Sequence, residues 1–385
     1  MKLVLINTVC NGSTGRIMCD IAKMANNNNY ETFCFFGRGK PNKNINCIKI
    51  ENKLSIYFHV FLARLGFNGH GSYFATKKLI KKIKEINPDV IHLHNIHGYY
   101  LNLKVLFKYL KNEYKGKIVW TLHDCWAFTG HCSHFTLAKC NKWKKECYDC
   151  PQLHSYPKEY FDTSQIEYKQ KMKLFLGLEN LILVTPSEWL KKLINQSFLK
   201  DYPTEVINNG IDLNIFKPTY DSDVYEKYNI PKNKKIVLGV ASIWGNEKGL
   251  ADFNKLSTML SSEYQIIIVG NLRSNKINDN IIHIERTDNA NELAKLYTLA
   301  YVFLNLTYED NYPTVNLESI CCNTPVISYD TGGCVEQVKN KGFIVNCGDL
   351  KQIIEVLNNN ILNKRINTKL YSISNMIDKY IKLYK

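Results

Sequence analysis

Short apolar runs that suit buried strands alternate with helix-length segments along the chain. Strands that alternate with helices form parallel sheets with helices packed on both faces. At 385 residues the chain exceeds the size at which one hydrophobic core keeps growing, so two domains are expected. The sequence therefore predicts an α/β protein with two doubly wound parallel sheets. The runs lie at 2–9, 32–36, 90–94, 118–122, 205–208, 236–240, 265–269, 281–284, 302–306 and 326–329.

A polar, proline-marked segment at 217–235 separates the two series of runs and has the composition of an interdomain linker. We expect a first domain at 1–215 and a second at 216–363. The remaining residues, 364–385, space their apolar side chains as one stripe of a helix and include no candidate catalytic or binding residue. This last segment is predicted to pack as part of the core.

The composition indicates a globular protein, with 45% hydrophobic and 22% charged residues. Met1 leads directly into an apolar strand, without the basic segment and cleavage site of a signal peptide. No run of apolar residues is long enough to span a bilayer. A cytoplasmic protein is therefore expected.

The formal net charge of +15 requires an account of its own. Many lysines are scattered among asparagines, which matches a lysine- and asparagine-rich composition, and no nucleic-acid partner is expected. Five lysines between 77 and 84 instead interleave with leucine and isoleucine at helical spacing. This pattern favours a solvated helix with its apolar face in the core. The alternative is peripheral attachment to the anionic inner face of a membrane, supported by the aromatic segment 57–67.

Thirteen cysteines without a secretion signal indicate reduced thiols or a metal site. Cys132, Cys140, Cys147 and Cys150 follow the spacing C-x7-C-x6-C-x2-C, and the last pair resembles half of a zinc knuckle. Four thiolates around zinc would pin an otherwise irregular loop and leave no open position for catalysis. A structural zinc site and free thiols in a packed loop both remain open.

Polar residues follow the apolar runs of the first half. Gly12, Ser13, Gly15 and Arg16 form a glycine loop that opens a helix, an arrangement that favours a bound phosphate or sugar. Ligands of wound parallel sheets bind beyond the carboxyl ends of the strands. His92 alternates inward and is predicted to be a core residue. The residues expected at these ends are His94, His97, His123 and Asp124.

The stretch 305–338 carries the strongest chemical signal. Glu309 and Asp310 follow an apolar strand, and Pro313 then occupies the first turn of a short helix. The helix start aims the amides of Thr314 and Val315 at the acidic loop, where a partial positive charge suits a phosphate. Glu318 lies one turn further along. Carboxylates for hydroxyls beside amides for phosphate predict a nucleotide-sugar site.

Five motifs together resemble the retaining glycosyltransferases of family four. They are GSTGRI at 12–17, TLHDCW at 121–126, NGID at 209–212, EKGL at 247–250, and EDNYPTVNLE with NTPVISYDTGG between 309 and 333. Within that family the TGHC…C…CPQL segment and the LYTLAYVFLNLTYEDNYPT run look most like the branch that assembles bacterial exopolysaccharide, capsule and O-antigen. The resemblance implies the GT-B fold, in which two Rossmann-like domains face a cleft and the final helix crosses back to the first domain.

The resemblance also implies roles for individual residues. Lys248 would neutralise the donor phosphates, Glu318 would bind the ribose hydroxyls, and His123 would lie beside the sugar. The family spaces its two glutamates E-x7-E, whereas Asp310 occupies that spacing from Glu318 and Glu309 lies one residue further away. Which of the two carboxylates holds the sugar stays open.

The family often has an arginine after the strand that precedes the phosphate lysine, and residues 240–244 contain none. Arg286 or Arg16 would then supply the second positive charge. Electrostatic stabilisation of the leaving diphosphate by Lys248 and the helix amides requires no metal and no cofactor.

We therefore expect a metal-independent hexosyltransferase that acts with retention on a glycan or lipid-linked glycan acceptor of a surface polysaccharide. The alternatives are a sugar-nucleotide 2-epimerase of the same fold and a non-catalytic nucleotide-sugar-binding partner of a polysaccharide assembly complex. The base, the sugar, the acceptor and the linkage are left open.

Overall fold

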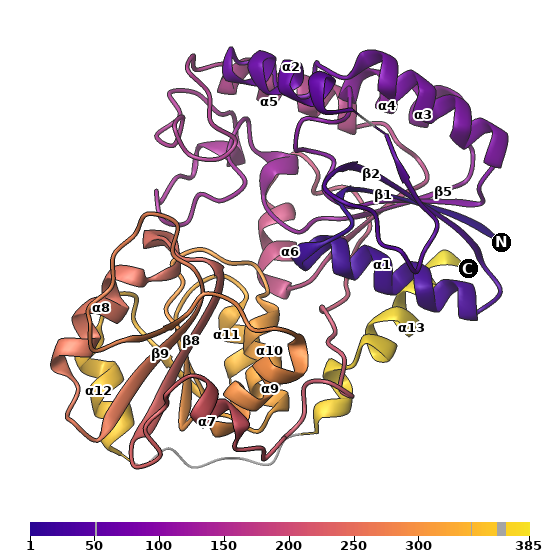
Figure 1. Ribbon diagram of the computed structural model, residues 1–385. Helices are drawn as coiled ribbons and strands as arrows, with labels where there is room; N and C mark the ends of the chain where they lie inside the picture. The colour runs from indigo at the N-terminus through magenta and orange to yellow at the C-terminus, as the bar shows by residue number, and fades with distance from the viewer. Residues whose placement is uncertain (51, 340, 360–366) are drawn as a thin grey trace. The chain divides into compact units, whose positions relative to one another are not determined.

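The computed structural model describes residues 1–50, 52–339, 341–359 and 367–385 (Figure 1). The chain divides into two compact units, unit 1 with residues 1–208 and 376–385, and unit 2 with residues 209–375. The boundary expected between 363 and 364 lies outside the described residues.

Unit 1 contains seven parallel strands in the order β3-β2-β1-β4-β5-β6-β7, with β1 paired to both β2 and β4. Because all neighbours are parallel, the strand ends that carry polar residues meet at one edge of the sheet. Its strands and helices are β1 (Lys2–Val9), α1 (Gly12–Asn27), β2 (Glu31–Arg38), β3 (Cys47–Lys49), α2 (Lys53–Arg64), α3 (Tyr73–Ile86), β4 (Val90–Leu93), α4 (Leu103–Asn112), β5 (Lys117–Thr121), α5 (Ser164–Phe175), β6 (Leu181–Thr185), α6 (Glu188–Ile194) and β7 (Thr204–Val206).

Helices cover both faces of the unit 1 sheet, with α3 and α4 on one face and α1 on the other (Figure 1). The face under α3 and α4 is filled by large side chains from strand and helix, among them Phe107, Trp120 and Phe175. The rings of Phe107 and Phe175 lie 4.6 Å apart. Strands buried on both faces explain why the strand sequences are almost continuously apolar.

Helix α13 (Ile373–Tyr384) brings the end of the chain onto the unit 1 sheet. The hydroxyl of Tyr384 lies 2.7 Å from Nδ1 of His92, and the hydroxyl of Tyr380 lies 3.0 Å from Oγ1 of Thr121. Oγ1 of Thr121 also lies 2.8 Å from Nε2 of His92. His92 is thus a buried histidine with a partner on each ring nitrogen, as predicted.

Unit 2 contains six parallel strands in the order β10-β9-β8-β11-β12-β13. Two hydrophobic clusters cover its two faces, because alternate residues of β8 point in opposite directions: Ile236 and Leu238 join one cluster and Val237 the other. Its strands and helices are α7 (Asp223–Lys227), β8 (Lys235–Ile243), α8 (Leu250–Met259), β9 (Tyr264–Asn271), β10 (Ile282–Ile284), α9 (Ala290–Leu299), β11 (Val302–Asn305), α10 (Thr314–Cys321), β12 (Val326–Tyr329), α11 (Cys334–Val338), β13 (Phe343–Val345) and α12 (Leu350–Asn358).

The segment 217–235, expected to be a linker, packs against unit 2. Nζ of Lys295 on α9 lies 2.6 Å from a carboxylate oxygen of Asp221 and 2.6 Å from one of Asp223. Val224 on α7 is fully buried. The segment is therefore part of the second unit and not a free connection.

Candidate active site

An ion pair between Lys248 and Asp310 lies at the carboxyl edge of the unit 2 sheet. Lys248 follows β8, Asp310 follows β11, and Nζ of the lysine lies 2.8 Å from Oδ2 of the aspartate. Nζ also donates to Oγ1 of Thr307 at 3.3 Å. Burial would lower the pKa of Lys248, but the adjacent Asp310 carboxylate outweighs burial and the pKa is raised. Lys248 therefore carries a fixed positive charge beside the acidic loop.

Glu309 and Asp310 both lie half-buried in the loop between β11 and α10. The loop is tied down by Thr307, whose hydroxyl donates to the carbonyl of Glu309 at 3.1 Å. Both carboxylates thus stand on a fixed backbone, and the choice between them as the sugar ligand stays a prediction.

Helix α10 begins directly after the acidic loop. Pro313 is its N-cap and provides no side-chain hydrogen bond, and Thr314 and Val315 in the first turn are half-buried. Its first-turn amides therefore lack the usual side-chain cap and carry the positive end of the helix dipole. Glu318 is only 3% exposed, and its Oε2 accepts a hydrogen bond from the hydroxyl of Tyr297 at 3.2 Å.

A chain of buried amide side chains holds the start of α10. Nδ2 of Asn305 donates to Oδ1 of Asn316 at 2.9 Å, and Nδ2 of Asn316 donates to Oε1 of Gln337 at 3.0 Å. Nε2 of Gln337 then donates to the carbonyl of Pro313 at 2.9 Å. These contacts join β11, α10 and α11. Sequence reasoning missed this network, for which an asparagine ending an apolar strand is the only local signal.

Two glycines with left-handed backbones approach the acidic loop closely. Gly249 has φ +74°, and a Cβ there would lie 2.3 Å from the carbonyl oxygen of Leu306. Gly332 has φ +50°, and a Cβ there would lie 1.8 Å from the carbonyl oxygen of Asp310. No other residue type fits either position without moving the loop.

Arg286 follows β10 at the same edge of the unit 2 sheet and is exposed. β10 is separated from β8 by β9, which places the two strands about 10 Å apart. Arg286 is therefore further from the acidic loop than Lys248, which contacts Asp310 in that loop.

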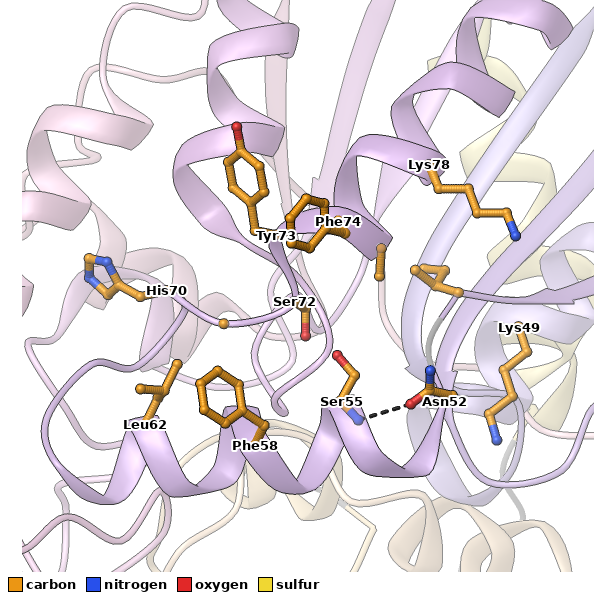
Figure 2. Close-up of a pocket in the computed structure, with 13 residues that line it drawn as sticks. Lys49, Asn52, Ser55, Phe58, Leu62, His70, Ser72, Tyr73, Phe74 and Lys78 are labelled. Carbon is orange, nitrogen blue, oxygen red and sulfur yellow. Dashed lines mark hydrogen bonds between the residues drawn. The ribbon is translucent and has the colours of Figure 1, made fainter.

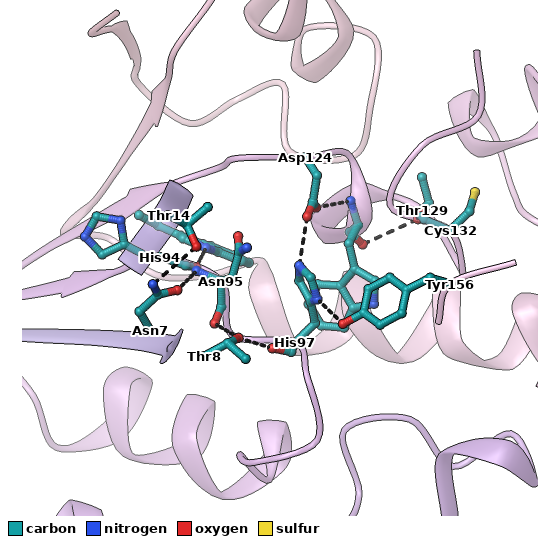
Figure 3. A network of polar contacts seen from close by, with 12 residues as sticks. Asn7, Thr8, Thr14, His94, Asn95, His97, Asp124, Thr129, Cys132 and Tyr156 are labelled. Carbon is teal, nitrogen blue, oxygen red and sulfur yellow. Dashed lines mark hydrogen bonds and ion pairs between the residues drawn. The ribbon is translucent and has the colours of Figure 1, made fainter. Parts of the chain in front are cut away.

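The strand ends of unit 1 gather histidines (Figure 3). Nδ1 of His94 lies 3.0 Å from Nε2 of His123, and the two rings stack with centroids 5.3 Å apart. Burial lowers the pKa of His123 to about 4 and holds that of His94 well below its usual range. Both imidazoles are therefore neutral near pH 7. They can share a proton between ring nitrogens and hydrogen-bond an uncharged ligand.

His97 and Asp124 form a second contact at this edge. Nε2 of His97 lies 2.8 Å from Oδ2 of Asp124, and its Nδ1 lies 3.3 Å from the hydroxyl of Tyr156 (Figure 3). Burial would raise the pKa of Asp124, but His97, His134 and the amide of Trp126 together outweigh burial and lower that pKa to about 2. The amide of Trp126 also donates to this carboxylate. Asp124 is thus an anion that orients the His97 ring.

The glycine loop forms the start of α1. Gly12 and Ser13 are exposed and the N-cap Asn11 makes no side-chain cap, so that the first-turn amides lack a side-chain acceptor. Arg16 is exposed one turn further along. Gly15 is instead buried, and a Cβ there would lie 2.6 Å from the backbone carbon of Cys10. The structure therefore gives Gly15 a packing role against the end of β1 and Cys10, and its ligand contact stays a prediction.

The four-cysteine zinc set predicted at 132–150 is not formed in the described structure. Cys147 Sγ accepts from the amide of Gly130 at 3.1 Å, and Cys150 Sγ lies 3.7 Å from Nδ1 of His131. In the described part of the chain, no group of three or more close metal-binding side chains includes Cys132, Cys140, Cys147 or Cys150.

Aromatic packing and hydrogen bonds to a buried lysine also order this loop. The rings of Phe135 and Trp143 stack at 4.9 Å, and Nζ of the buried Lys171 donates to the carbonyls of Trp126 and Thr129. An aromatic cluster and a buried lysine thus supply the order that the zinc prediction assigned to thiolates.

Helix α2 exposes an apolar stripe. Leu54, Tyr57, Phe58 and Phe61 lie at the i, i+3, i+4, i+7 spacing of one helix face, and all are between 57% and 82% exposed. Phe58 also lines a groove of about 660 Å³ (Figure 2). The side chain of Phe74 faces the groove from α3, with Lys49 and Lys78 at one end. Among the described helices, none is long and apolar enough to cross a membrane.

Comparisons with known proteins cover both units. A family described as Glycosyltransferase Family 4 matches residues 15–215, and one described as Glycosyl transferases group 1 matches residues 222–374. The chain is 27% identical over 320 residues to the putative colanic acid biosynthesis glycosyl transferase WcaC of Escherichia coli K12, covering 77% of this chain and 76% of the relative. It is 25% identical over 204 residues to the capsular polysaccharide biosynthesis glycosyltransferase CapM of Staphylococcus aureus, covering 48% of this chain and 53% of the relative.

Solved structures show the same fold. Sucrose-phosphate synthase from Thermosynechococcus elongatus superposes with a TM-score of 0.71 at 15% identity, covering 100% of this chain and 98% of the other. Alr3699/HepE from Anabaena in complex with UDP-glucose superposes with a TM-score of 0.69 at 14% identity, covering 100% and 99%. These similarities confirm the GT-B fold class.

Proposed function

The chain belongs to glycosyltransferase family 4, and from this premise we propose that it transfers a hexose from a nucleoside diphosphate sugar to a glycan acceptor. The acceptor is a growing, lipid-linked bacterial surface polysaccharide. The observation that carries the proposal is the charged Lys248 paired with Asp310 beside the uncapped start of α10. Relatives named for colanic acid and capsular polysaccharide biosynthesis support the class of product.

In this proposal Lys248 and the α10 amides stabilise the leaving diphosphate. The anomeric bond breaks with negative charge developing on the phosphate oxygen, and preorganised positive groups lower the barrier to that step. Without donor, Lys248 forms an ion pair with Asp310. When the donor binds, its diphosphate also interacts with the Lys248 ammonium and partly replaces this ion pair. Arg286 or Arg16 provides a further positive charge for the phosphates. Because the charge is met by protein groups, the transfer proceeds without a metal ion.

The remaining site residues bind the hydroxyl groups of the donor. Glu309 or Asp310 accepts hydrogen bonds from the sugar, and Glu318 accepts them from the ribose. The neutral state of His123 supports a hydrogen bond to the uncharged sugar rather than to phosphate. The exposed Gly12 and Ser13 at the start of α1 provide amides for the ligand. The anomeric configuration is retained, with departure and attack on the same face of the sugar.

The test compares Lys248→Ala with Lys255→Ala, a variant of an exposed lysine on the following helix α8. Purified proteins are incubated with UDP-, GDP- and dTDP-sugars, without added divalent metal, and release of the nucleoside diphosphate is measured. Loss of one preorganised donor typically reduces turnover about 100- to 1000-fold. We expect this loss in Lys248→Ala and none in Lys255→Ala, with unfolding temperatures that match the parent protein.

Other outcomes separate the alternatives. Near-normal turnover of Lys248→Ala would refute the assignment of the lysine. Conversion of a sugar nucleotide into its epimer without any acceptor would identify an epimerase. Tight donor binding without hydrolysis by any donor would identify a non-catalytic binding partner.

We further infer that the α2 face attaches the enzyme to an anionic membrane surface, where a lipid-linked acceptor is found. The four-residue apolar stripe provides burial in the headgroup region, and the lysines of α3 provide attraction to anionic lipid. Each aromatic side chain that inserts contributes about 1.5–3 kcal/mol.

The membrane test uses Phe58→Ser with Phe61→Ser. The matched control is Tyr220→Ser, which changes an 86% exposed ring in unit 2. Co-sedimentation with vesicles of phosphatidylglycerol and phosphatidylcholine should fall at least tenfold for the α2 variant only. Equal sedimentation of all three proteins, or binding to neutral vesicles alone, would contradict the inference.

A further inference from the structure

A second set of cysteines, outside the loop predicted to bind zinc, converges within unit 1. Cys10 follows β1, Cys19 lies on α1, and Cys47 begins β3. Their three sulfur atoms all lie within 4.8 Å of one another, and those of Cys10 and Cys47 are 3.4 Å apart. Three thiols from three separate elements therefore meet at one point.

A fourth cysteine stands beside this point. Cys34 on β2 is the direct partner of Cys47 in the parallel pairing of β2 with β3. Its side chain is fully buried, and it lies next to the group of three sulfurs that are mutually within 4.8 Å, not within that group. Cys10 and Cys19 are 3% exposed, whereas Cys47 is partly exposed and leaves an entry path from solvent.

The geometry matches a tetrahedral thiolate site. Zinc–sulfur bonds of about 2.3 Å place the sulfurs of one ion about 3.8 Å apart. The 3.4 Å between the sulfurs of Cys10 and Cys47 is close to this value, while a disulfide requires about 2.05 Å. Soft thiolate ligands select zinc over hard cations such as magnesium and calcium. We propose that Cys10, Cys19 and Cys47, completed by Cys34, bind a structural zinc ion.

Such an ion would fix the base of the glycine loop. Only Asn11 separates Cys10 from that loop, and Gly15 packs directly on the Cys10 backbone. Zinc would therefore join the end of β1, the body of α1 and the β2–β3 edge. Four protein ligands leave no open position on the ion, so its role is structural and separate from the sugar transfer.

The experiment measures zinc in the full chain purified with reductant and without chelator. The double variant Cys10→Ser with Cys47→Ser is compared with Cys132→Ser with Cys150→Ser in the other cysteine loop, and with the exposed Cys347→Ser. We expect about one zinc per chain in the parent and both controls. The Cys10/Cys47 variant should lose at least 80% of it.

Because unfolding of the double variant would also release zinc, a second measurement uses the unmodified chain. Replacement of the metal by cobalt(II) should give sulfur-to-cobalt charge-transfer absorption typical of tetrahedral thiolate coordination, and Cys34→Ser should weaken it. Retention of zinc in the Cys10/Cys47 variant would overturn the proposal, as would loss of zinc only from the Cys132/Cys150 variant. A Cys10–Cys47 disulfide without metal in anaerobically purified protein would also overturn it.

Discussion

Replacement of Gly332 by alanine tests whether its turn fixes the acidic loop. The residue has φ +50°, and the new Cβ would lie 1.8 Å from the carbonyl oxygen of Asp310. An ordinary contact between carbon and carbonyl oxygen is at least about 3.3 Å. Either the Asp310 backbone or the Gly332 turn must therefore move by about 1.5 Å.

The free-energy cost has two parts. A left-handed alanine costs about 1–2 kcal/mol, and forcing a methyl group into a packed site costs about 1–3 kcal/mol more. Together they lower the free energy of unfolding by about 2–5 kcal/mol. In a domain of this size each kcal/mol lowers Tm by about 2–4 °C, so a decrease of about 4–20 °C is expected.

Gly348→Ala is the matched control in the same unit. Gly348 has φ +79°, and the nearest atom to its added Cβ is the hydroxyl of Tyr308 at 3.3 Å. The control variant thus has the same left-handed backbone strain but little steric overlap of the new Cβ. Both variants also reduce the conformational entropy of the unfolded chain by the same Gly-to-Ala change. Its expected cost is about 1–2 kcal/mol.

Urea unfolding gives the stability difference, and release of nucleoside diphosphate gives turnover. A shift of about 1 Å at a catalytic group can reduce turnover about 100-fold. Gly332→Ala should therefore lose turnover beyond Gly348→Ala, because Asp310 leaves its position opposite Lys248. If the two variants agree within 0.5 kcal/mol and in turnover, the contact does not hold the acidic loop and the reasoning fails.

Three further perturbations test other parts of the two units. Asn316→Ala removes one hydrogen-bond partner from each of the buried amides of Asn305 and Gln337 and should lower the free energy of unfolding in urea by about 2–5 kcal/mol; a loss below about 1 kcal/mol would exclude the network. The pKa of His123 is about 4 in the folded protein and about 6.5 in the unfolded chain. Protonation below about pH 6.5 therefore favours the unfolded chain, and the protein loses stability as the pH falls from about 6.5 toward 4. Between pH 7 and pH 5 the parent should lose about 2 kcal/mol more than His123→Gln in parallel urea titrations, and equal losses would contradict a neutral buried imidazole. Glu318→Gln should weaken donor binding about tenfold or more in calorimetry while inorganic pyrophosphate binds normally, and an equal loss for pyrophosphate would place the residue elsewhere.

The fold class was predictable because strand burial leaves a direct mark on sequence. Continuous apolar runs separated by helices indicated two wound parallel sheets, and the structure confirms them. Short edge strands were missed. β3 and β13 have three residues each, and their side chains are largely half-buried or exposed, so neither shows an apolar run.

The candidate site was only partly predictable, because its contacts join distant segments. Asp310 was selected from its acidic loop and Lys248 through family resemblance, and no spacing rule relates residues 62 positions apart. The four cysteines around Cys10 come from four different elements, so no tight pair of the C-x2-C kind announces them. Conversely, the tight pair ending at Cys150 predicted a metal site, but among the described residues its four cysteines do not form a close metal-binding group.

The return of α13 to unit 1 has a consequence for biosynthesis. Residues 376–385 belong to the first unit, although all of residues 209–375 are made before them. During translation the nascent first unit therefore exposes His92 and Thr121 without the two tyrosines that later cover them. Unit 2 can complete its sheet while the ribosome is still at work, whereas unit 1 waits for the last helix. The unit that is begun first is thus the last to be completed.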